Sequence, residues 1–166
     1  MNHMRSLLIV FATSTALHTT AQDTTAMAST QFDFWLGQWD LTWANGGKGT
    51  NTITKEMNGH LVHERFADPA NNYHGESWSM WDAATGKWKQ TWVDDQGNYM
   101  AFEGGMVEDR MEMNMHMPDK KTGAMFLWRM VFSNITPDAF DWTWKRSPDE
   151  GKTWEVQWAI RYMRKG

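Results

Sequence analysis

The chain has 166 residues, a length that suits one domain with a substantial hydrophobic core. Its formal net charge is -4 and its basic residues form no cluster, so we expect no nucleic-acid partner. The lack of cysteine excludes disulfides and thiol chemistry, whereas 12 Trp and 14 Met supply far more apolar bulk than an average sequence carries.

Residues 1–28 have the pattern of a secretory signal. Arg5 provides a positive start, residues 7–16 form an apolar segment, and Ala21 and Ala28 offer small residues for cleavage. The apolar segment is too short to span a bilayer, and we expect no membrane insertion elsewhere. We predict a signal peptide and disordered leader, followed by a periplasmic or secreted protein. The alternative is an unstructured N-terminus on a cytoplasmic protein.

Residues 32–39 contain four aromatic side chains and a glycine. We expect a short helical turn here, with Ser29 or Thr30 capping its start. Its aromatic side chains would press onto one end of a sheet, and Gly37 would let the backbone turn into the first strand. This stretch therefore predicts a plug followed by a strand.

The rest of the chain alternates like short strands, broken by Gly, Asn, Asp and Pro. Ten strands are predicted, at residues 38–45, 48–57, 60–67, 74–82, 87–94, 98–104, 109–117, 124–134, 139–146 and 152–164. Asn58-Gly59 is typical of a type I′ hairpin turn, and Gly86 and Gly151 suit left-handed positions in turns. Strands joined by hairpins leave two exposed edges unless they close, so we predict an all-β, single up-and-down antiparallel barrel.

Gly37-Gln38-Trp39 resembles the G-x-W signature of lipocalins and other calycin barrels. In those proteins the Trp closes one barrel end against an arginine from the last strand. The resemblance therefore implies structural roles for Gly37 and Trp39, and for Arg161 or Arg164 as the stacking partner.

Four segments together are more specific and resemble an exported bacterial protein family of unknown function with a lipocalin-like (calycin) barrel domain. They are residues 32–40, 81–94, 151–154 and 162–165. The resemblance implies the fold and no activity, and we assign residues 29–166 to one barrel domain. Related nitrobindin barrels bind haem and carry G-x-W-x-G-x-G, but Leu41 and Trp43 replace the second and third glycines here. No cofactor is expected, with haem as a minor alternative.

Polar side chains with apolar neighbours two residues away on the same strand are candidates for the barrel interior, because side chains alternate across a strand. They are Glu64, Glu76, Gln90 and Arg129. With Trp88 and Trp92 beside Gln90, they predict a mostly apolar ligand site with a few polar groups. The alternative is that Glu64 or Glu76 pairs with Arg129 as a buried structural ion pair.

Histidine and methionine raise the question of metals. His60 and His63 are three residues apart and so lie on opposite strand faces, whereas His74 and Glu76 share a face but lack further ligands; we predict no metal site. Four alternating methionines occupy one face of the seventh strand, at residues 111, 113, 115 and 117. We favour core packing over a copper(I) site, because their spacing along the strand is too wide for joint ligation.

No catalytic motif is present, and no catalytic residue is assigned. The sequence predicts an exported protein that holds a small lipophilic molecule in a Trp/Met-rich barrel, with Gln90 and Arg129 orienting it. Two alternatives remain: an isomerase, cyclase or hydratase using His/Glu acid-base residues in the same cavity, or a filled barrel acting through surface contacts. A homodimer is also left open.

Overall fold

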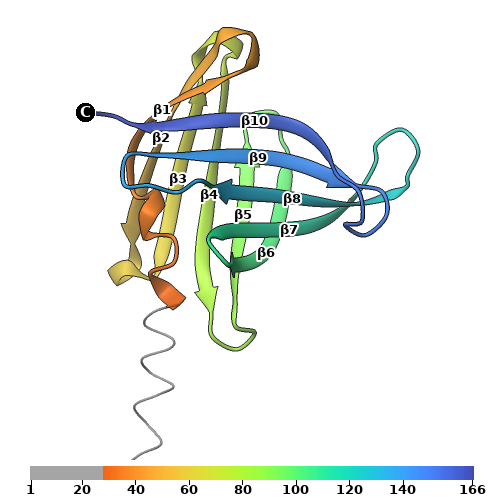
Figure 1. The fold of residues 1–166 in the computed structure, drawn as a ribbon, viewed down its shortest axis with the longest axis horizontal. Coiled ribbons are helices and arrows are strands. Elements are labelled where there is room, and N and C mark those ends of the chain that lie inside the picture. Colours follow the sequence, from red (N-terminus) through yellow and green to blue (C-terminus); the bar gives the residue numbers. More distant parts are fainter. Residues whose placement is uncertain (1–27) are drawn as a thin grey trace, which may run out of the picture.

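The computed structural model describes residues 28–166, which form a closed barrel of ten antiparallel strands (Figure 1). The strands are β1 (Gly37–Trp43), β2 (Gly47–Glu56), β3 (Leu61–Asp68), β4 (Tyr73–Asp82), β5 (Lys87–Asp94), β6 (Tyr99–Val107), β7 (Arg110–Pro118), β8 (Met125–Ser133), β9 (Ala139–Ser147) and β10 (Glu155–Arg164). Each strand pairs with the next in sequence, and β10 pairs with β1 to close the ring. The predicted up-and-down barrel is therefore confirmed.

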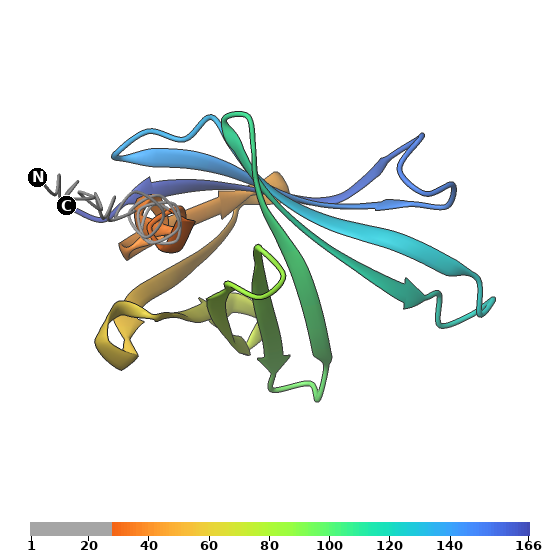
Figure 2. The ribbon, with the colours of Figure 1, turned by 90° about the horizontal axis from the view of Figure 1, so that it is seen from below.

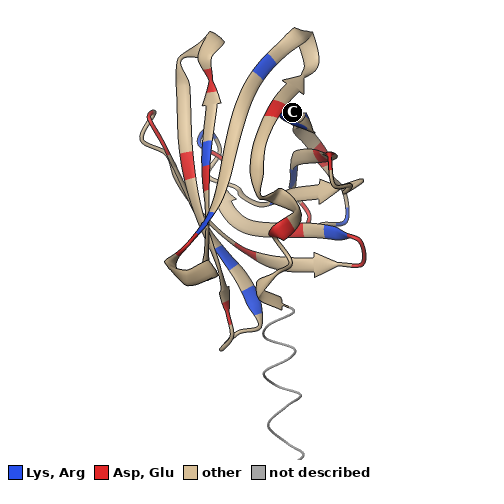
Figure 3. Cartoon of the chain, turned by 90° about the vertical axis from the view of Figure 1, so that its left-hand side faces the viewer, with Lys and Arg blue, Asp and Glu red and all other residues tan. Residues whose placement is uncertain are grey.

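The predicted signal peptide lies outside the described residues, apart from Ala28. Within residues 28–166, no helix has the length and apolar character needed to cross a membrane. Charged positions are interspersed over the barrel wall (Figure 3), in keeping with a sequence that has no basic cluster.

The hairpin turns follow the predicted chemistry. Gly86 and Gly151 have left-handed backbone angles, with φ of 64° and 88°. Asn58 and Gly59 also have positive φ, but so does Met57 at 49°, so the β2–β3 connection spreads over three residues. Asn and Gly tolerate positive φ, so their turn positions could be predicted from the sequence, whereas the positive φ of Met57 could not.

A short 3₁₀ turn, η1 (Asp33–Trp35), covers one end of the barrel. In Figure 2 this N-terminal segment lies between the blue strands β9 and β10 and the yellow strands on the other side. Phe32 is fully buried, and its ring packs edge-on against Trp88 at 4.8 Å and Phe132 at 5.7 Å. The predicted plug is confirmed, although Phe32 stands at the N-cap and its own side chain makes no capping hydrogen bond.

Trp39 fixes the junction between η1 and β1. Its Nε1 donates to the Trp35 carbonyl oxygen at 2.7 Å, and the Arg164 guanidinium lies 4.2 Å from its ring. Gly37 has φ of 121°, a conformation that favours glycine, and a Cβ there would lie 2.4 Å from Arg164 Nη1, so a side chain would also displace the arginine.

Arg161 is not the partner of Trp39. It faces outward and forms an ion pair with Asp141 at 2.9 Å. Arg161 and Arg164 are three residues apart on β10, so they point to opposite sides of the barrel wall, and only Arg164 can reach Trp39.

The interior next to the plug is packed with aromatic and methionine side chains. Met111 and Met113 are completely buried in this core, and Met115 is 8% exposed. Core packing, the favoured explanation of the alternating methionines, agrees with these positions.

Candidate functional site

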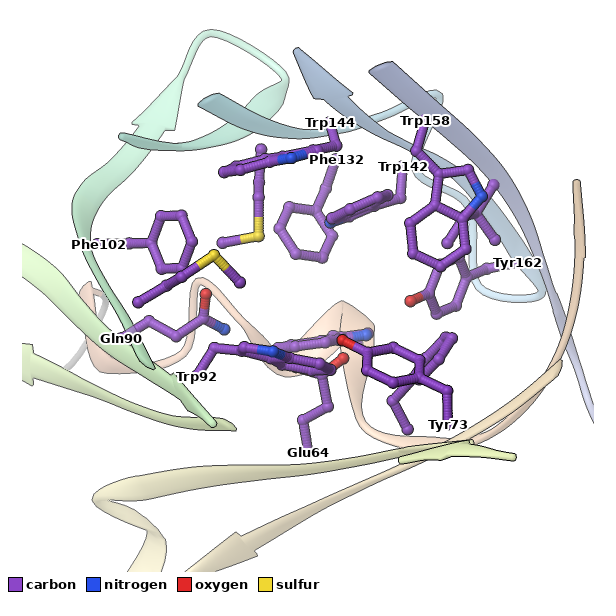
Figure 4. Close-up of a pocket in the computed structure, with 15 residues that line it drawn as sticks. Glu64, Tyr73, Gln90, Trp92, Phe102, Phe132, Trp142, Trp144, Trp158 and Tyr162 are labelled. Atoms are coloured by element: carbon purple, nitrogen blue, oxygen red, sulfur yellow. The ribbon is translucent and has the colours of Figure 1, made fainter. Parts of the chain in front are cut away.

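The barrel contains a partly open cavity of about 170 Å³ (Figure 4). Its lining is contributed by η1 and by seven strands, β3 to β6 and β8 to β10. Fifteen side chains line it; ten are aromatic, three are aliphatic or methionine, and two are Glu64 and Gln90. The barrel is therefore only partly filled, and the free space is walled mainly by rings.

The size of the cavity limits what it can hold. A cavity of about 150 Å³ with an apolar wall is enough to bind benzene, whereas drug-sized ligands occupy sites of about 300 Å³ or more. The present cavity, at about 170 Å³, matches one ring or an equally compact group.

A chain of hydrogen bonds crosses the cavity wall on four neighbouring strands. Asn51 Nδ2 donates to Glu64 Oε1 at 2.7 Å, Ser77 Oγ donates to Glu64 Oε2 at 2.5 Å, and Gln90 Nε2 donates to Ser77 Oγ at 3.1 Å. All four side chains are buried. The chain is held in place by β2, β3, β4 and β5, so its geometry is set by the sheet.

The direction of this chain follows from the carboxylate. Ionised Glu64 can only accept, so Ser77 must donate to it and must in turn accept from the Gln90 amide nitrogen. The Gln90 oxygen then has no partner among the described residues. Figure 4 shows that oxygen pointing into the cavity.

Glu64 is an unusual carboxyl group. Burial among apolar side chains raises its pKa to about 7, although the hydrogen bonds from Ser77 and Asn51 act in the opposite direction. Within residues 28–166, no lysine or arginine forms an ion pair with it. Glu64 therefore changes its protonation state near neutral pH inside a ring-lined cavity.

Two tyrosines place hydroxyl groups at the cavity wall. Asn51 Nδ2 also donates to the Tyr162 oxygen at 3.2 Å, and the Tyr73 hydroxyl donates to Asp94 Oδ2 at 3.0 Å. Burial raises the pKa of both phenols above its ordinary value, so they stay neutral. Glu64 is thus the group of the lining that ionises near neutral pH.

The structure brings together three of the predicted ligand residues. Glu64, Gln90 and Trp92 line the cavity. Trp88 lies at the closed end instead, where it packs against Phe32 and its Nε1 donates to Gln31 Oε1 at 3.1 Å. Trp88 therefore belongs to the plug and not to the cavity lining.

Glu76 faces the outside of the barrel, contrary to the prediction. Its Oε2 bonds His63 Nε2 at 2.7 Å, and His63 stacks on Trp78. On β4 the interior side carries Gly75 and Ser77. Position 75 has no side chain because a Cβ there would lie 2.1 Å from the Trp92 ring. The outer side of this strand also carries large side chains, so alternation along the strand predicted the wrong face for Glu76.

Arg129 also lies outside. Its Nη1 is 2.7 Å from Glu112 Oε2, its Nε donates to Asn114 Oδ1 at 2.6 Å, and its guanidinium lies 4.5 Å from the Trp154 ring. Met130 lines the cavity, so its neighbour Arg129 points the other way. Trp154 covers the Arg129 guanidinium on this outer face.

The expected structural ion pair of Arg129 exists, but its partner is Glu112 and not Glu64 or Glu76. Asn51, Ser77 and Tyr162 were also missed in the sequence. Asn51 and Ser77 stand among other small polar residues on their strands. Asn51 shares a strand face with Ile53 and pairs with Phe66, and Ser77 pairs with Glu64 and Trp92, but this pairing is known only from the structure. Tyr162 was recognisable as part of the last strand but not as a cavity residue.

The histidines do not meet a carboxylate in the cavity. His63 and His74 bond Glu76 and Asp95, respectively, on the outer side of the wall. In the described part of the chain, no three His, Asp or Glu side chains are grouped so that they could hold a metal ion. Among residues 28–166, the His/Glu contact therefore lies on the outer face, and no histidine accompanies Glu64 in the cavity lining.

No protein-family model matches the sequence, and no curated protein matches it either. The closed ten-stranded barrel is consistent with a calycin-like fold. The resemblance to one exported bacterial family stays a prediction from the sequence.

Proposed function

We propose that this protein binds a small, mostly apolar molecule about the size of one aromatic ring, in an exported compartment. The cavity of about 170 Å³, lined largely by rings, supports this proposal. The N-terminal sequence pattern supports export. Aromatic walls supply contact area to a flat ligand, and the few polar groups would orient it.

The observation that carries the proposal is the free oxygen of Gln90. Gln90 is 3% exposed, and its oxygen has no hydrogen-bond partner in the described part of the chain. An unsatisfied buried acceptor costs about 1–3 kcal/mol, and a ligand with a donor would recover that cost. The Ser77 bond holds this oxygen in one direction, so the acceptor is preorganised.

Isothermal titration calorimetry with one-ring compounds, such as phenol, aniline, indole and benzyl alcohol, tests the proposal. We expect saturable binding at one site, and we expect Met100→Trp to abolish it because Met100 lines the cavity. Met80→Trp is the matched control, since Met80 is 47% exposed on the outer side of β4. Thermal melting checks that both variants fold. Binding by no compound, or equal binding by the Met100 variant, would contradict the proposal.

Glu64 favours a second candidate, an enzyme that uses the same cavity. A carboxyl group with a pKa near 7 can both give and take a proton at neutral pH, which is the property of a general acid-base group. Here Glu64 acts without a histidine partner. This candidate requires chemical turnover of a bound one-ring compound, detected by mass spectrometry, that Glu64→Gln removes while binding persists.

A further inference from the structure

The cavity is acidic in character, although its wall consists mainly of aromatic rings. Glu64 lines it, and among the described residues no Lys, Arg or His does. Arg129, the one basic residue that the sequence placed inside, is bound to Glu112 on the outer face. Any ligand therefore meets one ionisable carboxyl group and no compensating positive charge.

The groups that face Glu64 are neutral. Asn51 on β2 and Ser77 on β4 donate to it, and Tyr162 on β10 shares the Asn51 amide. On β3 itself the neighbouring His63 points to the outer face, where it bonds Glu56 and Glu76. An ionised Glu64 thus has hydrogen bonds but no counterion.

The aromatic wall adds negative potential of its own, since the faces of indole and phenol rings attract cations. Trp142 and Trp158 meet edge to face at 5.8 Å, so their rings present different orientations to the same space. Asp94 accepts hydrogen bonds from Tyr73 at 3.0 Å and from Trp92 Nε1 at 3.2 Å. A second carboxylate therefore stands directly behind two of the lining rings.

Resting on the function proposed above, we propose that the ligand is a small organic cation: one ring, or a compact alkyl group, that carries a protonated amine. The ammonium group would donate to Glu64 and to the Gln90 oxygen, and the rings would surround the apolar part. Glu64 on β3 and Gln90 on β5 flank β4, and Ser77 on β4 bonds both side chains, so we expect one ammonium group to reach both acceptors. A carboxylate ligand would face repulsion from Glu64 and find no cation in the lining.

Three isosteric probes test the charge selection by calorimetry at about pH 8: benzylamine as cation, benzyl alcohol as neutral analogue and benzoate as anion. We expect benzylamine to bind at least about tenfold more tightly than benzyl alcohol, and benzoate not to bind. In Glu64→Gln, the preference for benzylamine over benzyl alcohol should disappear. Glu76→Gln, on the outer face, is the matched control and should change neither.

Proton release provides a measurement that needs no variant. Glu64 holds its proton at slightly acidic pH and must give it up to pair with an ammonium ion. Calorimetry of benzylamine at about pH 6 in buffers of different ionisation enthalpy should therefore show release of close to one proton, whereas benzyl alcohol should release none.

The outcomes separate the two proposals. If benzylamine and benzyl alcohol bind equally, or if benzylamine binds without proton release and unaffected by Glu64→Gln, cation selection is wrong while small-molecule binding stands. If benzoate binds best, cation selection is likewise wrong. If no one-ring compound of either panel binds, both proposals fall.

Discussion

Two carboxylates, Glu64 and Glu112, are equally buried, each 6% exposed, yet they have opposite surroundings. Glu112, on the outer face, lies 2.7 Å from Arg129 and 3.4 Å from Arg110. Glu64, in the cavity, has only the neutral donors Asn51 and Ser77. The partner, and not the burial, therefore decides whether each of these carboxylates is structural or is available to a ligand.

The difference has an energetic basis. Removing a carboxylate from water is costly, and a nearby cation offsets that cost at Glu112. At Glu64 the cost is not offset, and it appears as a pKa raised to about 7. A site of this kind has free energy to gain from a cationic ligand, whereas the outer site already contains its cations.

The largest effect is expected when the paired site is broken. Arg129→Met should reduce the free energy of unfolding by about 3 kcal/mol, because Glu112 keeps only the more distant Arg110. Urea denaturation at about pH 7 measures the loss. Benzylamine affinity should not change, since Arg129 lies outside the cavity.

Lys145→Met is the control for Arg129→Met. Lys145 Nζ lies 4.8 Å from the same Trp154 ring, but it forms no ion pair with Glu112 in the described part of the chain. Its loss should cost less than about 1 kcal/mol. Equal losses in the two variants would mean that contact with Trp154, and not the ion pair, holds the outer site.

The unpaired site should make the free energy of unfolding depend on pH. Glu64 has an ordinary pKa of 4.5 in the unfolded chain and about 7 in the fold, so the folded protein holds the extra proton between these values. The stability that Glu64 contributes is therefore complete below about pH 4.5 and is lost as the pH rises through about 7. Glu64→Gln, which cannot ionise, should gain about 3 kcal/mol relative to wild type between about pH 4 and about pH 8.

Urea denaturation of wild type and Glu64→Gln at both pH values gives this change directly. The change in the difference between the two proteins is the informative quantity, because Gln also alters the hydrogen bond with Asn51 or Ser77. A difference that stays constant with pH would mean that Glu64 titrates at its ordinary pKa and that the contrast with Glu112 is wrong.

The same contrast shows what the sequence could and could not predict. The strands, the turns at Gly86 and Gly151 and the plug follow from local patterns that need no partner, whereas the role of Trp39 came from the resemblance to lipocalins. Whether a side chain faces the cavity or the outside could not be predicted in this way, because it depends on what covers the outer face. Trp154 covers Arg129, and Gly75 makes room inside for Trp92; neither is visible from alternation along one strand. Thus Glu64 and Gln90 were placed correctly, whereas Arg129 and Glu76 were not.

The smallest effect should come from the link between Glu64 and Gln90. Ser77 and Ser79 are both fully buried on β4, but Ser77 Oγ joins Gln90 to Glu64 and Ser79 Oγ has no hydrogen-bond partner among the described residues. Ser77→Ala should therefore cost about 1–2 kcal/mol in urea denaturation, and Ser79→Ala should be neutral within about 0.5 kcal/mol or slightly stabilising.

Ser77→Ala should also raise the pKa of Glu64 further, because the Ser77 hydrogen bond is one of the contacts that lower it. An NMR titration of the Glu64 carboxyl carbon measures this shift, with Ser79→Ala as the control that leaves it unchanged. Without Ser77, the Gln90 amide loses the bond that directs its oxygen into the cavity, so benzylamine affinity should fall in this variant alone. A Ser77 variant that keeps both the pKa and the affinity would show that the four-residue chain does not organise the cavity.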